Sequence, residues 1–132
     1  MIRGSAGKDL LNKLIFMGRN EDVVEIEGVK FTMSSLSEDQ NRVLLEKVFN
    51  LSDSERLSQA KSIAVASSLV KINEFEMDTV IKDVDEGETP FDKKMILISK
   101  MQASVIGKLY SAFERINISV DPEEASEDLK NS

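Results

Sequence analysis

The chain has 132 residues, of which 41% are hydrophobic, and this is enough apolar material for the core of one small domain. Acidic residues outnumber basic ones by 24 to 17, so the net charge is -7. We expect no nucleic-acid partner, because such proteins present a basic face. Cysteine and histidine are absent, which excludes disulfides, zinc fingers, a thiol nucleophile and a histidine-based triad. We therefore predict no catalytic, metal or cofactor site, and a protein that is not an enzyme.

Signals for targeting are missing from the sequence as given. It contains no run of 18 apolar residues, so it predicts no membrane span. The first five residues, MIRGS, lead into no signal-peptide core ahead of a cleavage site. We expect the chain to be made in a cytoplasm.

Charge is unevenly distributed along the chain. Residues 1–19 carry four bases and one acid, whereas residues 20–73 carry nine acids and six bases. Residues 74–89 have seven acids and one base, and residues 90–117 have five bases and two acids. Residues 118–132 are acidic again, with five acids and one base. Such alternation is typical of a solvated surface, and it also suits electrostatic matching within the chain or between neighbouring subunits.

The first predicted element is a short helix over residues 8–17, where leucine, isoleucine and methionine recur at helical spacing. Gly18 would end this helix. Because a helix of this length is marginal alone, it needs a surface to pack on.

Residues 22–33 switch to a period of two, which predicts a β-hairpin that turns at Gly28. The register of this hairpin places Val24 opposite Phe31 on one face and an acid opposite a base on the other. An isolated hairpin is not stable, so we expect it to lie on helices or to join a larger sheet.

Two helices with capping boxes follow the hairpin. Ser37 with Gln40 predicts the start of the first, and Ser52 with Glu55 predicts the start of the second. The second helix is predicted over residues 53–72 and is apolar or small on nearly all sides in its second half, so we expect it to be the central buried helix. In the helix that begins at Ser37, the expected buried stripe consists of Leu44, Leu45, Val48 and Phe49.

The last predicted helix is long. Residues 73–89 are acidic and contain a glycine, so they are interpreted as a loop. Thr89 then provides a cap and Pro90 the first helical position. The helix runs from 90 to about 117, which is about 42 Å at 1.5 Å per residue. Residues 118–132 are mostly acidic and are predicted to form a flexible tail.

An apolar face wider than one small domain requires runs along this last helix. We predict that it forms the main partner-binding surface. Two alternatives are open: the stripe is only core, or the first short helix folds back and covers it. The predicted partner-binding residues are Phe91, Met95, Ile98, Met101, Val105, Leu109 and Phe113.

Together these elements predict an α+β fold that is mostly α, a helical domain with an N-terminal β-hairpin and a long C-terminal helix. Residues 1–19 form a basic N-terminal segment with a short helix in this interpretation. Residues 20–117 form a single helical domain that contains the hairpin, and residues 118–132 form the acidic flexible tail.

The order of these features resembles a known class of protein. The strand pair EIEGVKFTM (25–33) is followed by SSLSEDQ (34–40) and by a helix ending in IAVASSLVKINE (63–74). An acidic loop and the helix KMILISKMQASVIGKLYSAFERI (94–116) complete the order. This arrangement is similar to small assembly proteins of tailed bacteriophages, especially the baseplate-hub and tail-assembly-chaperone families.

In those families a strand-to-helix start with a G-x-x-F/V-x-x-x-x-L pattern precedes a helical body that ends in helices like L-Y-x-x-F. The positions that correspond in this chain are Gly28, Phe31, Leu36, Leu109, Tyr110 and Phe113. The similarity covers roughly residues 23–117, and the matching positions are structural, with no catalytic or ligand signature among them.

The resemblance implies a non-enzymatic structural or assembly protein of a bacteriophage tail or baseplate, which acts through protein–protein contacts. Its partners would be other phage structural proteins or further copies of itself, with no cofactor. Its place would be the host cytoplasm or the virion. The alternative is a cellular helical adaptor or regulatory protein with an apolar partner groove.

Overall fold

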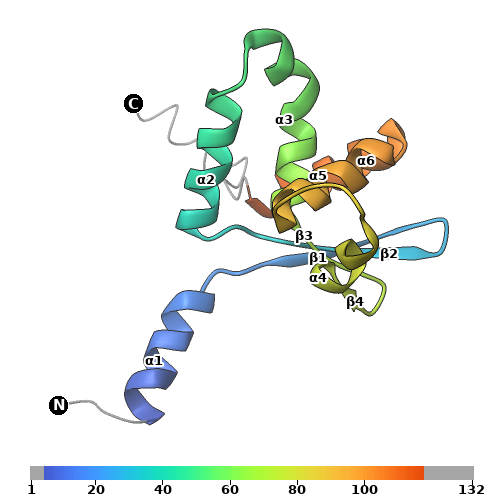
Figure 1. Ribbon diagram of the computed structural model, residues 1–132. Coiled ribbons are helices and arrows are strands. Elements are labelled where there is room, and N and C mark those ends of the chain that lie inside the picture. The colour runs from blue at the N-terminus through green and yellow to red at the C-terminus, as the bar shows by residue number, and fades with distance from the viewer. Residues whose placement is uncertain (1–4, 118–132) are drawn as a thin grey trace, which may run out of the picture.

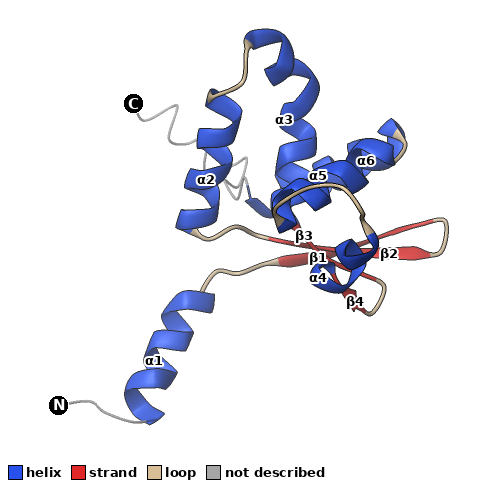
Figure 2. Cartoon of the chain, in the orientation of Figure 1, coloured by secondary structure: helices blue, strands red, loops and turns tan. Residues whose placement is uncertain are grey.

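The structure is a computed structural model that describes residues 5–117. Within that range the fold is α+β, with six α-helices and one four-stranded antiparallel sheet (Figure 1; Figure 2). The predicted fold class, mostly helical with an N-terminal hairpin, is confirmed. In chain order the elements are α1 (Ser5–Phe16), β1 (Glu21–Ile26), β2 (Val29–Ser34), α2 (Glu38–Phe49), α3 (Asp53–Ser68), β3 (Leu69–Ile72), β4 (Phe75–Glu76), α4 (Met77–Val80), the 3-10 helix η1 (Ile81–Asp83), α5 (Pro90–Lys100) and α6 (Ala103–Asn117).

The hairpin of β1 and β2 has the predicted register. Val24 lies opposite Phe31 in the antiparallel pair. Glu27 and Gly28 form the turn with φ values of 50° and 81°, the left-handed conformation that a two-residue hairpin turn requires. The sheet then continues in sequence order, β1-β2-β3-β4. The hairpin is therefore not isolated, because β3 and β4 extend it into a larger sheet.

The core lies between one face of this sheet and the helices α3 and α6, which contact each other and the strands. Met33 of β2 and Leu69 of β3 are fully buried. Val65 of α3 and Leu109 of α6 are also fully buried and pack in the same cluster. The predicted central position of the second half of α3 is confirmed, because its residues from Ile63 to Ala66 are all buried.

Three helices begin where the sequence predicts. Ser37, Ser52 and Thr89 each accept a hydrogen bond from the backbone N–H three residues later, and the side chain of that later residue accepts one in return. Pro90 occupies the first turn of α5. These reciprocal bonds satisfy donors that a helix start otherwise leaves free.

The prediction that the second helix continues to residue 72 is wrong. α3 ends at Ser68, and Leu69–Ile72 form strand β3, which pairs with β2. The buried Ser68 hydroxyl donates a hydrogen bond to the Ser34 carbonyl at the junction. Helical propensity is a weak preference, and here the unpaired edge of β2 outweighs it by offering hydrogen bonds to the backbone of β3.

The prediction of a loop over residues 73–89 is also wrong in its first part. After a turn at residues 73–74, that part contains β4, α4 and η1, and residues 84–89 are irregular. Met77 and Ile81 are both buried and anchor the short helices in the core. The acidic composition obscured this, because exposed charged residues lie directly beside both apolar anchors.

The predicted long final helix is two helices. α5 ends at Lys100, Met101 is extended at φ -81° and ψ 157°, and α6 begins at Ala103. The Gln102 carbonyl accepts from the amides of Val105 and Ile106, so it starts the second helix. Because of this break, α5 and α6 each turn a separate face toward the core. The apolar positions of residues 90–117 are therefore spread more widely than one helix with a single buried face would need.

The outer parts of the predicted domain division lie partly beyond the described residues. The predicted acidic tail, residues 118–132, lies outside them, and so do residues 1–4 of the basic segment.

At the end of α6, the side-chain oxygen of Asn117 accepts a 2.6 Å hydrogen bond from the amide of Leu36. Arg115 forms a 2.9 Å ion pair with Asp22 of β1. Both contacts tie the last helix to the start of the domain.

Candidate interaction surface

The seven residues predicted to bind a partner have mixed positions. Ile98, Leu109 and Phe113 are buried in the core, at 1%, 0% and 8% exposure. These three residues offer no surface to a partner in this fold. The other four are half-buried and pack against the same core, and their role in binding stays a prediction; they are Phe91, Met95, Met101 and Val105.

The most exposed apolar surface lies instead on α1 and the residue that follows it. Its large apolar side chains are 51% to 68% exposed, and α1 stands apart from the rest of the domain (Figure 1). The alternative in which this helix folds back over the last helix is therefore not the observed arrangement. The exposed residues are Leu10, Leu11, Leu14, Ile15, Phe16 and Met17.

Four of these side chains form one stripe along α1, and Met17 directly follows the helix. We call these five residues the arm stripe: Leu10, Leu11, Leu14, Ile15 and Met17. Residues three and four apart on a helix are neighbours, so the stripe is flanked by Lys8 on one side and Lys13 on the other. Asp9, Asn12 and Phe16 occupy the opposite face. A helix with an apolar stripe that faces water is a surface that burial against another protein would stabilise.

The base of α1 is held to the domain by polar contacts. The guanidinium of Arg19 donates to the Ser34 hydroxyl at 3.0 Å and pairs with Glu21 at 3.1 Å. Asn20 and Ser35 exchange two hydrogen bonds of 2.8 Å, backbone N–H to backbone carbonyl and backbone N–H to hydroxyl. Gly18 lies between the end of α1 and these contacts, and its φ of 80° is in the left-handed region. The chain is therefore anchored to the domain from Arg19 onward, and Gly18 sets the direction in which α1 points.

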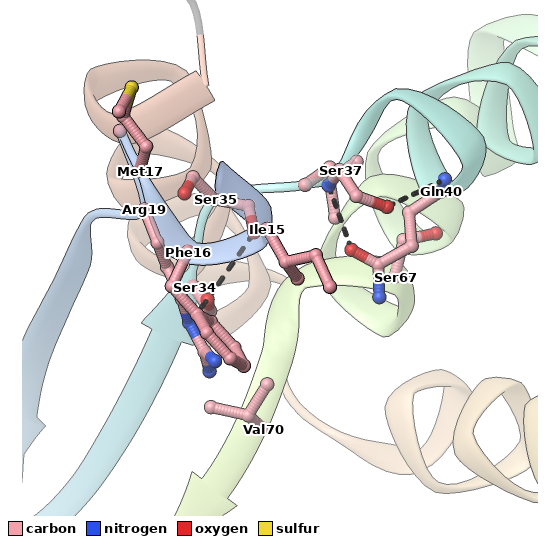
Figure 3. A pocket seen from close by; sticks show the side chains of 12 residues that line it. Ile15, Phe16, Met17, Arg19, Ser34, Ser35, Ser37, Gln40, Ser67 and Val70 are labelled. Atoms are coloured by element: carbon pink, nitrogen blue, oxygen red, sulfur yellow. Dashed lines mark hydrogen bonds between the residues drawn. The ribbon is translucent and has the colours of Figure 1, made fainter. Parts of the chain in front are cut away.

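A half-open cavity of about 350 Å³ lies at this base (Figure 3). The end of α1 forms one wall with Ile15 and Phe16, and Ser67 and Val70 form part of the other. Several polar groups around it are already engaged: the Ser37 hydroxyl with the amide of Gln40, and the Gln40 side chain with the amide of Ser37. The cavity thus separates the arm from the domain, and it gathers no set of free reactive groups among its lining residues.

A second concentration of exposed apolar residues lies on α2. Val43, Leu45 and Phe49 are 43%, 45% and 68% exposed. The prediction that Leu45 and Phe49 belong to a buried stripe is wrong, because α2 contacts the domain mainly through Leu44 and Val48. Phe49 is held in place by Arg56, whose guanidinium lies 5.9 Å from its ring centroid.

Val43 lines a shallow groove of about 260 Å³ between α2, α3 and α5. Ala66 and Phe91 contribute the other apolar walls of this groove. The ammonium of Lys47 lies 4.3 Å from the ring centroid of Phe91, where it covers part of the floor. A small apolar side chain from a partner would fit this groove.

Sequence reasoning identified the helix that carries the arm stripe but did not assign it to the interaction surface. Its signal was available: five apolar residues lie on one side of a ten-residue segment, with a glycine after them. The sequence could not show whether the domain covers this stripe, because that depends on the direction in which α1 is joined to the start of β1.

Compared with known proteins, the chain matches no family model, and it has no significant match among curated proteins or solved structures. None of the helices in residues 5–117 has the length and apolarity that crossing a bilayer demands.

Proposed function

We propose that this chain is a non-enzymatic structural or assembly protein that acts through protein–protein contacts. The observation that carries the proposal is the arm stripe, five large apolar side chains of α1 and the residue after it, which are each more than half exposed. The largest exposed apolar patch of a monomeric protein is often a functional site. A twelve-residue helix is also marginal alone, so contact with a partner would stabilise it.

The setting we propose is the tail or baseplate of a bacteriophage, with other phage structural proteins as partners. The support is the order of features described above: a strand pair, a strand-to-helix start at Leu36 and a final helix containing Leu109, Tyr110 and Phe113. The chain would then act in the host cytoplasm or within the virion.

The second candidate is a cellular helical adaptor or regulatory protein. One observation favours it, the groove lined by Val43, Ala66 and Phe91, which is apolar in its walls and open to solvent. A groove of this size suits one or two side chains of a partner helix or peptide.

The proposal is tested by following the full chain in infected cells. We expect the wild-type chain to sediment with assembled particles or with a defined assembly intermediate. The Leu14→Glu variant places a charge in the arm stripe and should lower this association at least tenfold. Asn12→Glu, on the opposite face of the same helix, is the matched control and should associate like wild type.

Two results would contradict the proposal. Equal association of the Leu14→Glu and wild-type chains would remove the arm stripe from the function. A wild-type chain that never sediments with particles, but binds a host protein through Val43 and Phe91, would favour the adaptor.

A further inference from the structure

We propose that α1 of one copy docks on the outer face of α2 in a second copy, so that the chain assembles with itself through its arm. This inference rests on the proposed function and deepens it by naming one partner, another molecule of the same chain.

The acceptor is chosen by where the remaining exposed apolar surface lies. Outside α1 and Met17, six large apolar residues of the described chain are more than about two-fifths exposed, and three of them are on α2. Leu45 and Phe49 are four residues apart and so share one face of that helix. α1 and α2 each have 12 residues, so the two helices can pair over their whole length, about 18 Å.

The charges beside the two faces are complementary. Lys8 and Lys13 flank the arm stripe, while Glu38 lies two turns before Leu45 and Glu46 lies one turn before Phe49. Within residues 5–117 none of these four charged groups forms an ion pair.

Two basic residues lie beside this face, Arg42 on α2 and Arg56 on α3, whose guanidinium lies 5.9 Å from the ring centroid of Phe49. Both are already paired, Arg42 with Asp39 at 3.2 Å and Arg56 with Asp53 at 3.5 Å. The acceptor face therefore carries free negative charge where the arm carries free positive charge.

Net charge also favours arm-to-domain contact over arm-to-arm contact. Residues 5–16 carry two bases and one acid, whereas residues 17–117 carry 18 acids and 13 bases. Two arms would repel each other, and an arm would be attracted to the domain of another molecule.

A second copy is favoured over the arm's own domain by the way the arm is anchored. Contacts of Arg19 and Asn20 hold the base of α1 against Ser34 and Ser35. From that base α1 runs away from α2 of its own chain (Figure 1). Ile15 and Met17 line the cavity at the base of the arm, and the three leucines of the arm stripe are presented beyond it, where another molecule can reach them.

The apolar area is sufficient for a specific dimer. A leucine-sized side chain carries roughly 60 to 120 Å² of apolar surface, so half-exposed stripe residues would bury about 50 Å² each. The five stripe residues give about 250 Å² per arm, and the covered surface doubles this. Reciprocal exchange of two arms would bury about 1,000 Å² in total, which is the least expected of a specific interface.

The test measures the mass of the purified full chain by sedimentation equilibrium over a range of concentrations. We expect a wild-type dimer or larger closed assembly, and at least tenfold weaker self-association for Leu14→Glu and for Phe49→Glu. Asn12→Glu makes a similar change on the polar face of α1 and should associate like wild type. Thermal melting checks that each variant is folded, and Leu45→Glu replaces Phe49→Glu if the latter unfolds.

Mixing the two defective variants tests the arm-to-α2 contact directly. The Phe49→Glu chain has an intact arm, and the Leu14→Glu chain has an intact acceptor, so the mixture can form one of the two arm-to-α2 contacts. It should associate more weakly than wild type but more strongly than either variant alone. No gain on mixing would overturn the assignment of α2 as the acceptor.

A monomeric wild-type chain, or a dimer that Leu14→Glu leaves unchanged, would overturn the inference as a whole. Each of these failures is distinguishable from failure of the proposed function. A monomer that still sediments with particles leaves the proposed function in place. A dimer with no particle association supports self-assembly and counts against the phage setting.

Discussion

Gly28 holds the second position of the hairpin turn, at φ 81°, where a side chain strains the backbone. A Cβ built there meets no atom within 4 Å, so the cost of a substitution is conformational and not a clash. We expect Gly28→Ala to lower the free energy of unfolding by about 1 kcal/mol. Urea denaturation measures it.

Gly107 provides the matched control for this substitution. It lies inside α6, where a Cβ also meets nothing within 4 Å and φ is in the ordinary helical range. Gly107→Ala should therefore raise the free energy of unfolding by about 0.5–1 kcal/mol. If Gly28→Ala and Gly107→Ala changed the free energy of unfolding in the same direction, the explanation of the Gly28 turn would be contradicted.

Glu55 carries the one resolved pKa shift among the groups described. Hydrogen bonds from the Ser52 hydroxyl and backbone N–H lower the pKa of this carboxyl below its ordinary value of 4.5. A pKa lowered by folding means that the ionised group stabilises the domain above the ordinary pKa, and that this stabilisation is lost as pH falls through the folded value. Stability at the start of α3 should therefore decrease in acid.

Glu55→Gln tests this pH dependence, because Gln40 shows that an amide fits the same position in the capping box of α2. The difference in unfolding free energy between wild type and Glu55→Gln should be constant above about pH 6 and should shrink toward pH 3. Denaturation curves at both pH values measure it. A difference that does not change with pH would show that the carboxylate contributes no pH-dependent stability.

At the scale of elements, the junction between α3 and β3 depends on one buried hydroxyl. Ser68 is fully buried and donates its hydrogen bond to the Ser34 carbonyl of β2. Ser68→Ala leaves that carbonyl without this donor, so we expect a loss of about 1–3 kcal/mol in the free energy of unfolding. Urea denaturation measures the loss.

The neighbouring Ser67 supplies the control for this prediction. Its hydroxyl donates to the Ile63 carbonyl one turn back within the same helix, at 2.8 Å. That carbonyl already belongs to the helical ladder, so Ser67→Ala should change stability by less than about 0.5 kcal/mol. Equal losses in the two variants would mean that the tie between α3 and β2 is not special.

For the molecule as a whole, stability depends on a single core that joins the sheet to α3 and α6. Leu109 is 0% exposed at its centre. We expect Leu109→Ala to lower the free energy of unfolding by about 2–5 kcal/mol, because the removed methyl groups leave a cavity. The melting transition should shift as one cooperative step.

Leu57 allows the same substitution outside the core. It is 90% exposed on α3, so Leu57→Ala should change the free energy of unfolding by less than about 0.5 kcal/mol. A loss at Leu57 as large as the loss at Leu109 would show that the exposed side of α3 is covered in solution.

The helix starts and the hairpin could be predicted from the sequence because they depend on short-range contacts. Ser37, Ser52 and Thr89 cap helices through residues only three positions away. Val24 and Phe31 pair across a two-residue turn, so their register follows from the local alternation. The α+β class then follows from these local elements, and it could be predicted without the tertiary structure.

The tertiary structure alone decided where elements end and which apolar residues are covered. Leu69–Ile72 form a strand because β2 offers an unpaired edge, and the last helix breaks at Met101 because both halves face one core. The arm stripe and Leu109 have similar apolar character in sequence, yet Leu14 is 59% exposed and Leu109 is fully buried. Burial depends on which distant surfaces the folded chain brings together, and a local pattern of side chains does not contain that information.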